Sequence, residues 1–217
     1  MKNFAKSMSS PLYALENVLN GRDLVLPGHK DLEVVRHMKN HLTPTPDDAQ
    51  KAAVVLLVHA THGYPSIIFI QRTNNLPHDK HRGQIAFPGG KLEEDESLKE
   101  CAFREMHEEI GIWLPPEHPV TSLTPLYISV SNFRVQPYIA IQERIPTPTP
   151  NPAEVSAVID SPLTDHQNRF KIRRKDICVR DIVLNDVPYY DIDGHTLWGA
   201  TALIFAEFLE IYNLQNL

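Results

Sequence analysis

The sequence predicts an α+β fold in which a mixed β-sheet is sandwiched between helices. Short apolar or alternating segments typical of strands occur at 52–59, 66–72 and 134–142, and they outnumber the helical segments. The clear helical segments, 97–110 and 198–214, do not alternate with the strands as they would in a doubly wound parallel fold. We therefore expect one sheet with helices on its faces, preceded by a short helical extension.

Residues 1–48 are predicted to form that extension and a linker. Apolar residues recur at helical spacing, so a helix should begin at about Leu12 and end at the Asn20-Gly21 pair. A second, weaker helical stretch spans 31–41, and a Thr/Pro-rich linker follows it. These helices should pack on the main domain, residues 49–217, or on a second subunit. Their apolar stripe is the reason for expecting a possible homodimer.

The main domain should begin with a β-hairpin. Segments 52–59 and 66–72 are strands by composition, and the Gly63-Tyr-Pro turn separates them. A loop then occupies 73–82. The segment 83–90 contains Phe-Pro-Gly-Gly, which a helix does not tolerate.

The second half of the main domain should add strands and a closing helix. We expect the segment 154–159 to be either a turn leading into a strand or a short helix. An amphipathic helix is predicted at 198–214, with Trp198 packed in the core. The remaining predicted strands are 122–129, 134–142 and 176–183.

The helix at 97–110 has clear signals at both ends. Ser97 and Glu100 have the spacing of a capping box, in which each side chain accepts a hydrogen bond from the other residue's backbone. Gly111 stands where a left-handed residue would end the helix.

This helix has an acidic face and an apolar face. At about 100° per residue, Glu105, Glu108 and Glu109 share one face. Such crowded like charges destabilise a helix unless a positive group offsets them. Mg²⁺ or Mn²⁺ suits the face, because these ions prefer oxygen ligands. The apolar side chains expected to pack on the sheet are Phe103, Met106 and Ile110.

The helix and its flanks resemble the Nudix box, G-x5-E-x7-R-E-U-x-E-E-x-G-U, at every fixed position. Met106 and Ile112 occupy the apolar U positions of this pattern. The matching fixed residues are Gly90, Glu96, Arg104, Glu105, Glu108, Glu109 and Gly111.

The resemblance implies the Nudix fold and a pyrophosphohydrolase activity. It implies that Glu105, Glu108 and Glu109 hold Mg²⁺ or Mn²⁺, with help from the Gly90 carbonyl. Such ions neutralise the diphosphate of a nucleotide substrate and lower the pKa of the attacking water. The resemblance also implies that Arg104 pairs with Glu96 and, with Gly111, supports the site rather than doing chemistry.

The segment before the box is similar to the extra motif of the coenzyme A pyrophosphatases. Asp79 stands where that motif has its second Arg, and the gap between Arg72 and Gly83 is longer than in the motif. The basic residues Lys80, His81 and Arg82 of the same loop are candidates to bind the 3′-phosphate of coenzyme A. The residues that match the motif in type are Arg72, Gly83, Phe87, Pro88, Gly89 and Gly90.

Two later segments, 151–158 and 197–202, also resemble this subgroup. In that resemblance Glu154 lies near the metal site as a candidate general base. The implied reaction is hydrolysis of coenzyme A or its derivatives to 3′,5′-ADP and 4′-phosphopantetheine. The alternatives are a Nudix hydrolase of ADP-ribose, dinucleotides or oxidised nucleotides, and a non-catalytic nucleotide-sensing module.

Composition limits the class of protein. The net charge of −6 argues against general nucleic-acid binding. The two cysteines, Cys101 and Cys178, cannot form a disulfide framework, so a reducing, cytoplasmic setting is expected. The first 21 residues lack a continuous apolar run, so neither a secretory segment nor a membrane span is expected there.

Overall fold

The computed structural model describes residues 10–21, 24–29, 45–75, 80–179 and 182–216. The helices are α1 (Tyr13–Leu19), α2 (Leu98–Ile110), α3 (His166–Arg169) and α4 (Gly199–Asn213), followed by the 3₁₀ turn η2 (Leu214–Asn216). The strands are β1 (Gln50–His59), β2 (Ser66–Arg72), β3 (Ile85–Ala86), β4 (Gly89–Lys91), β5 (Val120–Ser122), β6 (Leu126–Ile128), β7 (Phe133–Gln142), β8 (Val155–Pro162), β9 (Arg173–Val179), β10 (Ile182–Ile192) and β11 (His195–Trp198).

The main sheet is mixed, as predicted. Its central order is β3-β2-β1-β7-β5, and β4, β6 and β8 pair with β1, β7 and β2 respectively. Strands β1 and β7 run parallel over ten residue pairs, whereas the other pairings in this sheet are antiparallel. The predicted hairpin of β1 and β2 is confirmed, with Val58 opposite Ile67.

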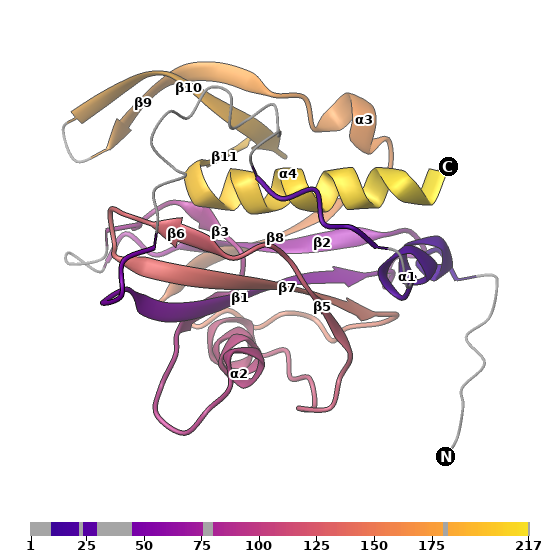
Figure 1. Cartoon of the computed structure of the whole chain (residues 1–217). Helices are drawn as coiled ribbons and strands as arrows, with labels where there is room; N and C mark the ends of the chain where they lie inside the picture. The colour runs from indigo at the N-terminus through magenta and orange to yellow at the C-terminus, as the bar shows by residue number, and fades with distance from the viewer. Residues whose placement is uncertain (1–9, 22–23, 30–44, 76–79, 180–181, 217) are drawn as a thin grey trace.

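The sheet separates two apolar layers (Figure 1). Successive side chains of a strand point to opposite faces, so β1 contributes Val55 and Leu57 to the layer under α2, and Leu56 and Val58 to the layer under α4. Helix α2 therefore covers one face and α4 the other, as the predicted sandwich requires.

A second sheet lies on the far side of α4 (Figure 1). It has the strand order β11-β10-β9 and is antiparallel. Because both sheets cover α4, most of that helix is buried, including Phe205 and Phe208 at 0% exposed. The prediction of an amphipathic closing helix was right about its extent but underestimated its burial.

Two strand predictions were wrong in detail. The segment 122–129 is not one strand, because Pro125 has no N–H for the ladder and Thr124 donates its N–H and hydroxyl to the carboxylate of Glu207. The segment 176–183 spans the end of β9 and the start of β10, which pair with each other. The segment 154–159 proved to be a turn leading into a strand, β8, the first of the two expected alternatives.

The described part of the N-terminal extension packs on the main domain. Helix α1 begins and ends close to the predicted positions, and Leu12 and Leu15 are 0% exposed within the layer under α4. The described part of the apolar stripe that suggested a homodimer thus packs within the chain. The second predicted helix, 31–41, lies outside the described residues. Within the described ranges, no helix is long and apolar enough to cross a membrane.

Candidate active site

The site is built on α2, whose predicted ends are both confirmed. The Ser97 hydroxyl accepts a hydrogen bond from the Glu100 N–H (3.3 Å), and the Glu100 carboxylate accepts one from the Ser97 N–H (2.8 Å). Gly111 ends the helix with a left-handed φ of 71°. A side chain there would be strained in conformation and tight against Thr149. Because the helix begins after Ser97 and ends before Gly111, the residues between them follow the helical repeat that was assumed in assigning its two faces.

The apolar face of α2 packs as predicted. Phe103, Met106 and Ile110 are at most 4% exposed and belong to the apolar layer beneath the main sheet. This packing holds the acidic residues of the helix beside the chain that enters and leaves β4.

Three glutamates meet at one place. One carboxylate oxygen from each of Glu105, Glu109 and Glu154 lies within 4.8 Å of the others. Glu154 comes from the turn before β8, and its carbonyl accepts a hydrogen bond from the Thr73 N–H that follows β2 (2.8 Å). We call Glu105, Glu109 and Glu154 the acid cluster. Glu108 lies outside this cluster, with its side chain 51% exposed.

Arg104 ties the acidic residues together. Its guanidinium donates to both oxygens of Glu96, at 3.0 and 2.9 Å, the pairing that the sequence predicted. It also donates to Glu105 (3.0 Å) and to Glu108 (2.9 Å). The Glu96 carboxyl has a lowered pKa, chiefly because of its hydrogen bonds to Arg104. Arg104 thus fixes the direction in which Glu105 points.

The backbone of β4 completes the cluster. The Gly89 N–H donates to a Glu109 oxygen at 2.9 Å. A Cβ at Gly90 would lie 2.3 Å from the carboxyl carbon of Glu105, so a side chain there would push that carboxylate out of its present position. The role of the Gly89 N–H was not predicted, because a backbone donor leaves no mark in a side-chain pattern.

The acid cluster carries more negative charge than its surroundings balance. Burial raises the pKa of Glu109 to about 8, although the Gly89 N–H and the charge of Arg72 oppose the shift. Burial also raises the pKa of Glu105. The nearest guanidinium nitrogen of Arg72 lies 3.6 Å from Glu109. Enclosed carboxylate oxygens that lack a sufficient counter-charge are the donor set that Mg²⁺ and Mn²⁺ prefer, so the residues fit such an ion.

The structure places the expected substrate-binding residues in three different surroundings: the acid cluster, a cavity and the apolar core. Arg72 reaches the acid cluster, and the Gly83 N–H donates to the Arg72 carbonyl (3.1 Å). His81 contacts the Gln84 side chain at 3.3 Å. Phe87 is 2% exposed and stacks on Phe69 with ring centroids 4.8 Å apart, so it is a core residue that does not face a ligand.

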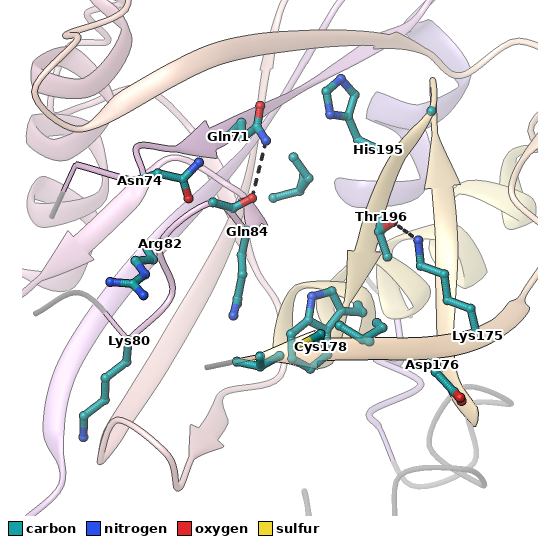
Figure 2. Close-up of a pocket in the computed structure, with 16 residues that line it drawn as sticks. Gln71, Asn74, Lys80, Arg82, Gln84, Lys175, Asp176, Cys178, His195 and Thr196 are labelled. Carbon is teal, nitrogen blue, oxygen red and sulfur yellow. Dashed lines mark hydrogen bonds between the residues drawn. The ribbon is translucent and has the colours of Figure 1, made fainter. Parts of the chain in front are cut away.

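Lys80, Arg82 and Gly83 line a cavity of about 610 Å³ next to the end of β2 (Figure 2). The opposite wall comes from the second sheet and includes Lys175 and His195, which sequence reasoning missed. The basic run 173–175 was the one signal that could have indicated this wall. Trp198, expected in the core, lines the same cavity.

Comparison with known proteins agrees with this architecture. The NUDIX domain family matches residues 49–175, more than half of the chain. A protein of Schizosaccharomyces pombe named as a probable nudix hydrolase is 31% identical over 77% of this chain and 58% of its own length. An uncharacterized Nudix hydrolase, NudL, of Pectobacterium atrosepticum is 36% identical over 55% of this chain and 62% of its own length. The chain therefore spans about three fifths of these two relatives.

Among solved structures, a MutT/nudix family protein from Enterococcus faecalis aligns with a TM-score of 0.50 and 15% identity, over 83% of this chain and 69% of that one. This likeness bears on the fold alone. The family match, together with the box residues, defines the class: the chain belongs to the Nudix family. The two relatives are hydrolases by name.

Proposed function

We propose that this chain hydrolyses the diphosphate linkage of coenzyme A or its derivatives to 3′,5′-ADP and 4′-phosphopantetheine. The observation that carries the hydrolytic part is the acid cluster. Glu109 is 1% exposed, and its carboxylate lies against those of Glu105 and Glu154. Among the residues that the structure describes, Arg72 is the cation that approaches it. Such a site is costly to build unless it binds a cation.

In this proposal Glu105, Glu108 and Glu109 hold Mg²⁺ or Mn²⁺, with the Gly90 carbonyl as a further ligand. The bound ion supplies charge neutralisation of the diphosphate and a lowered pKa for the attacking water. Glu154, which comes from a different element than the box glutamates, is the candidate to accept the proton of that water. Arg104, itself held by Glu96, donates to the carboxylates of Glu105 and Glu108, and Glu108 would reach the ion from outside the acid cluster.

The choice of coenzyme A rests on the segment between Arg72 and Gly90. Its match to the coenzyme A motif coincides with two cationic residues, Lys80 and Arg82, on the cavity at the end of β2. A cationic cavity suits a substrate with a phosphate beyond its diphosphate. ADP-ribose and the dinucleotides without a ribose phosphate lack that group. They remain the second candidates, because Asp79 replaces an Arg of the motif.

We further propose a reducing, cytoplasmic setting. Both cysteines are free thiols, Cys101 buried and Cys178 exposed, which is in keeping with such a compartment. A small-molecule nucleotide is the proposed partner, and a homodimer remains a prediction with no support from the described part of the extension.

A substrate panel tests the function. Coenzyme A and ADP-ribose are supplied at matched concentration with Mg²⁺ or Mn²⁺, and products are separated by chromatography. We expect 3′,5′-ADP from coenzyme A at a rate at least about tenfold above that of ADP-ribose cleavage, equivalent to about 1.4 kcal/mol in the barrier. Faster cleavage of ADP-ribose would make the second candidate correct.

The Glu109→Gln variant is the control for the panel. It keeps the size of the side chain but removes the charge, so we expect a loss of at least about a hundredfold in rate, equivalent to about 2.7 kcal/mol. Full activity in this variant would refute the metal-site assignment. Binding of nucleotides without turnover of any of them by the unaltered chain would point to a sensing module.

A further inference from the structure

The cavity beside β2 has two walls that are far apart in sequence. One wall comes from the chain around β3 and includes Asn74, Arg82 and Gln84. The other comes from β9, β11 and the turn before β11 in the second sheet, and includes Lys175, His195 and Thr196. Figure 2 shows these two groups of side chains on either side of the same space. The second sheet is therefore part of a binding-sized concavity rather than an isolated surface addition.

The polar lining of this cavity favours an anion. Lys80, Arg82 and Lys175 contribute positive charge, while the acidic side chain in the lining is Asp176. Asp176 already accepts a hydrogen bond from the Asp186 N–H at 2.8 Å. The net character of the lining is thus cationic, which is the opposite of the net charge of −6 for the whole chain.

Lys175 is held in place on the second sheet. Its ammonium donates to the Thr196 hydroxyl at 2.6 Å and lies 4.7 Å from the centre of the Tyr189 ring. Lys80 is directed differently, because its ammonium donates to the Val130 carbonyl at 2.9 Å. Lys175 is consequently the better-fixed of these two lysines for recognising an anion.

The cavity also has an apolar component. Ile85, Ile177 and Trp198 line it together with the amide side chains of Gln71 and Gln84. A flat ring can stack on an indole or cover aliphatic side chains while its edge meets amide groups. This combination of a cationic and an apolar lining matches a nucleoside that carries a phosphate monoester.

A residue that lines the cavity and a residue that reaches the acid cluster are neighbours in the sequence, at the end of β2. Gln71 lines the cavity, and the next residue, Arg72, reaches Glu109. The backbone of Arg72 also joins the cavity wall, because its N–H donates to the Gln84 carbonyl at 3.0 Å and its carbonyl accepts from Gly83. Because successive side chains of a strand point to opposite faces, Gln71 and Arg72 place the cavity and the acid cluster on opposite sides of the end of β2. A substrate with its diphosphate at the acid cluster has to pass around this end of the strand to reach the cavity.

We propose that the β9–β10–β11 sheet is a specificity element, and that its Lys175 and His195 bind the phosphate monoester on the nucleoside end of the substrate. This proposal rests on the proposed function for the identity of the substrate. The new element is that the loop before β3 and the second sheet share the recognition of the extra phosphate. The second sheet lies largely beyond the part of the chain matched by the NUDIX domain.

Cys178 allows the proposal to be tested without catalysis. Its thiol lines the cavity and is exposed, whereas Cys101, the other cysteine, is buried. The rate of alkylation of Cys178 by a maleimide is measured with EDTA present, so that no hydrolysis occurs. The probes are adenosine 3′,5′-bisphosphate, adenosine 5′-monophosphate and inorganic phosphate. A Cys178→Ser variant establishes which thiol is measured.

We expect the bisphosphate to slow alkylation by about tenfold at a concentration about ten times its dissociation constant. The monophosphate and inorganic phosphate should protect much less at that concentration. Lys175→Ala and His195→Ala should each weaken protection by the bisphosphate by about tenfold or more in concentration, equivalent to about 1.4 kcal/mol. Arg173→Ala is the matched control, because Arg173 is on the same strand and pairs with Asp191 outside the cavity lining.

Absence of protection by the bisphosphate would overturn the proposal, and so would equal protection by the monophosphate. Protection that is unchanged in both Lys175→Ala and His195→Ala would also overturn it. The near- and far-ultraviolet circular dichroism of each variant shows whether it folds, and two independent variants keep the test decisive if one does not. Because no metal or turnover is involved, these outcomes are separate from those of the substrate panel.

Discussion

At the scale of single residues, Arg104 determines the geometry of the acidic residues. One guanidinium serves Glu96, Glu105 and Glu108 at once, and it also donates to the Lys91 carbonyl. Its planar group can make this set of bonds, whereas the ammonium of a lysine cannot reproduce the fork toward Glu96. The residue acts through the glutamates, so it is a positioning residue.

Arg104→Gln should therefore weaken metal binding, because the glutamates stay in the chain but lose the group that orients their carboxylates. We expect the Mg²⁺ concentration for half-maximal turnover to rise by about 10- to 100-fold, as is usual when a group that orients metal ligands is lost. Arg174→Gln is the control, because Arg174 pairs with Asp186 in the second sheet. A fall in maximal rate with no change in metal dependence would contradict the positioning role.

Glu109 should make the stability of the metal-free protein depend on pH. Its carboxyl has a pKa of about 8 in the folded state against an ordinary value of 4.5, mainly because of burial. Between these values the folded state holds a proton that the unfolded state has released. The free energy of unfolding should thus fall as pH rises through this window, by up to about 1.4 kcal/mol per pH unit from this group, and level off above the folded pKa.

Denaturant unfolding at about pH 5.5 and about pH 7.5 in EDTA checks this expectation against Glu109→Gln, which cannot ionise. The variant should lose less stability than the unaltered protein as pH rises. Equal pH dependence in the two proteins would show that Glu109 ionises normally. Addition of Mg²⁺ or Mn²⁺ should stabilise the unaltered protein most at the higher pH, where the carboxylate is charged.

At the scale of elements, α2 depends on its capping box. Both reciprocal hydrogen bonds between Ser97 and Glu100 are present, and both residues lie at the exposed start of the helix. The hydrogen bonds lower the pKa of the Glu100 carboxyl. The cap sets the first turn of the helix that carries the glutamates.

Ser97→Ala should reduce the free energy of unfolding by about 1 kcal/mol, within the range measured for other helix caps. Urea unfolding measures the change, and Ser122→Ala, at an exposed position of β5, should change stability by less than about 0.5 kcal/mol. A loss in Ser97→Ala no greater than in Ser122→Ala would mean that the cap adds nothing.

At the scale of the whole molecule, α4 joins two sheets. Phe205 is 0% exposed, and its ring lies 5.4 Å from Phe69 of the main sheet and 5.4 Å from Tyr190 of the second sheet, measured between centroids. On the same helix Glu207, at 0% exposed, binds Thr124 and lies 3.3 Å from His29 of the extension. Burial by itself would raise the pKa of the Glu207 carboxyl. Its hydrogen bonds to His29 and Thr124 outweigh that effect, so the pKa is lowered.

Phe205→Ala should destabilise the chain by about 3–5 kcal/mol, because it removes a buried ring and leaves a cavity where both sheets meet the helix. Phe205→Leu keeps most of the volume and should cost much less. Guanidinium unfolding followed by tryptophan fluorescence measures both, since Trp198 stands at the start of α4. A loss below about 1 kcal/mol in Phe205→Ala would show that α4 does not hold the sheets together.

Local signals in the sequence predicted the parts of this protein that local interactions decide. The box helix was predicted with both ends because Ser97, Glu100 and Gly111 act within a turn of the chain. The hairpin of β1 and β2 was predicted for the same reason. The second sheet was missed, because the segment 176–183 was interpreted as a single strand although it holds the end of β9 and the start of β10, which pair with each other.

Contacts between segments that are far apart in the sequence could not be predicted. Glu154 was named from resemblance alone, and the backbone bonds that bring it to the cluster join residues 73 and 154. Lys175 and His195 had no local pattern that linked them to Arg82. The acidic residues could thus be named in advance, but the far wall of the cavity could not.

The position of α4 in the chain has a consequence for synthesis. The NUDIX match ends at residue 175, whereas the helix that covers one whole face of the main sheet ends at residue 213. During synthesis on the ribosome, the apolar side chains of that face stay uncovered until α4 has emerged. Phe69 and Phe87 are among them. A fragment cut to the family boundary should expose this apolar face and aggregate rather than fold.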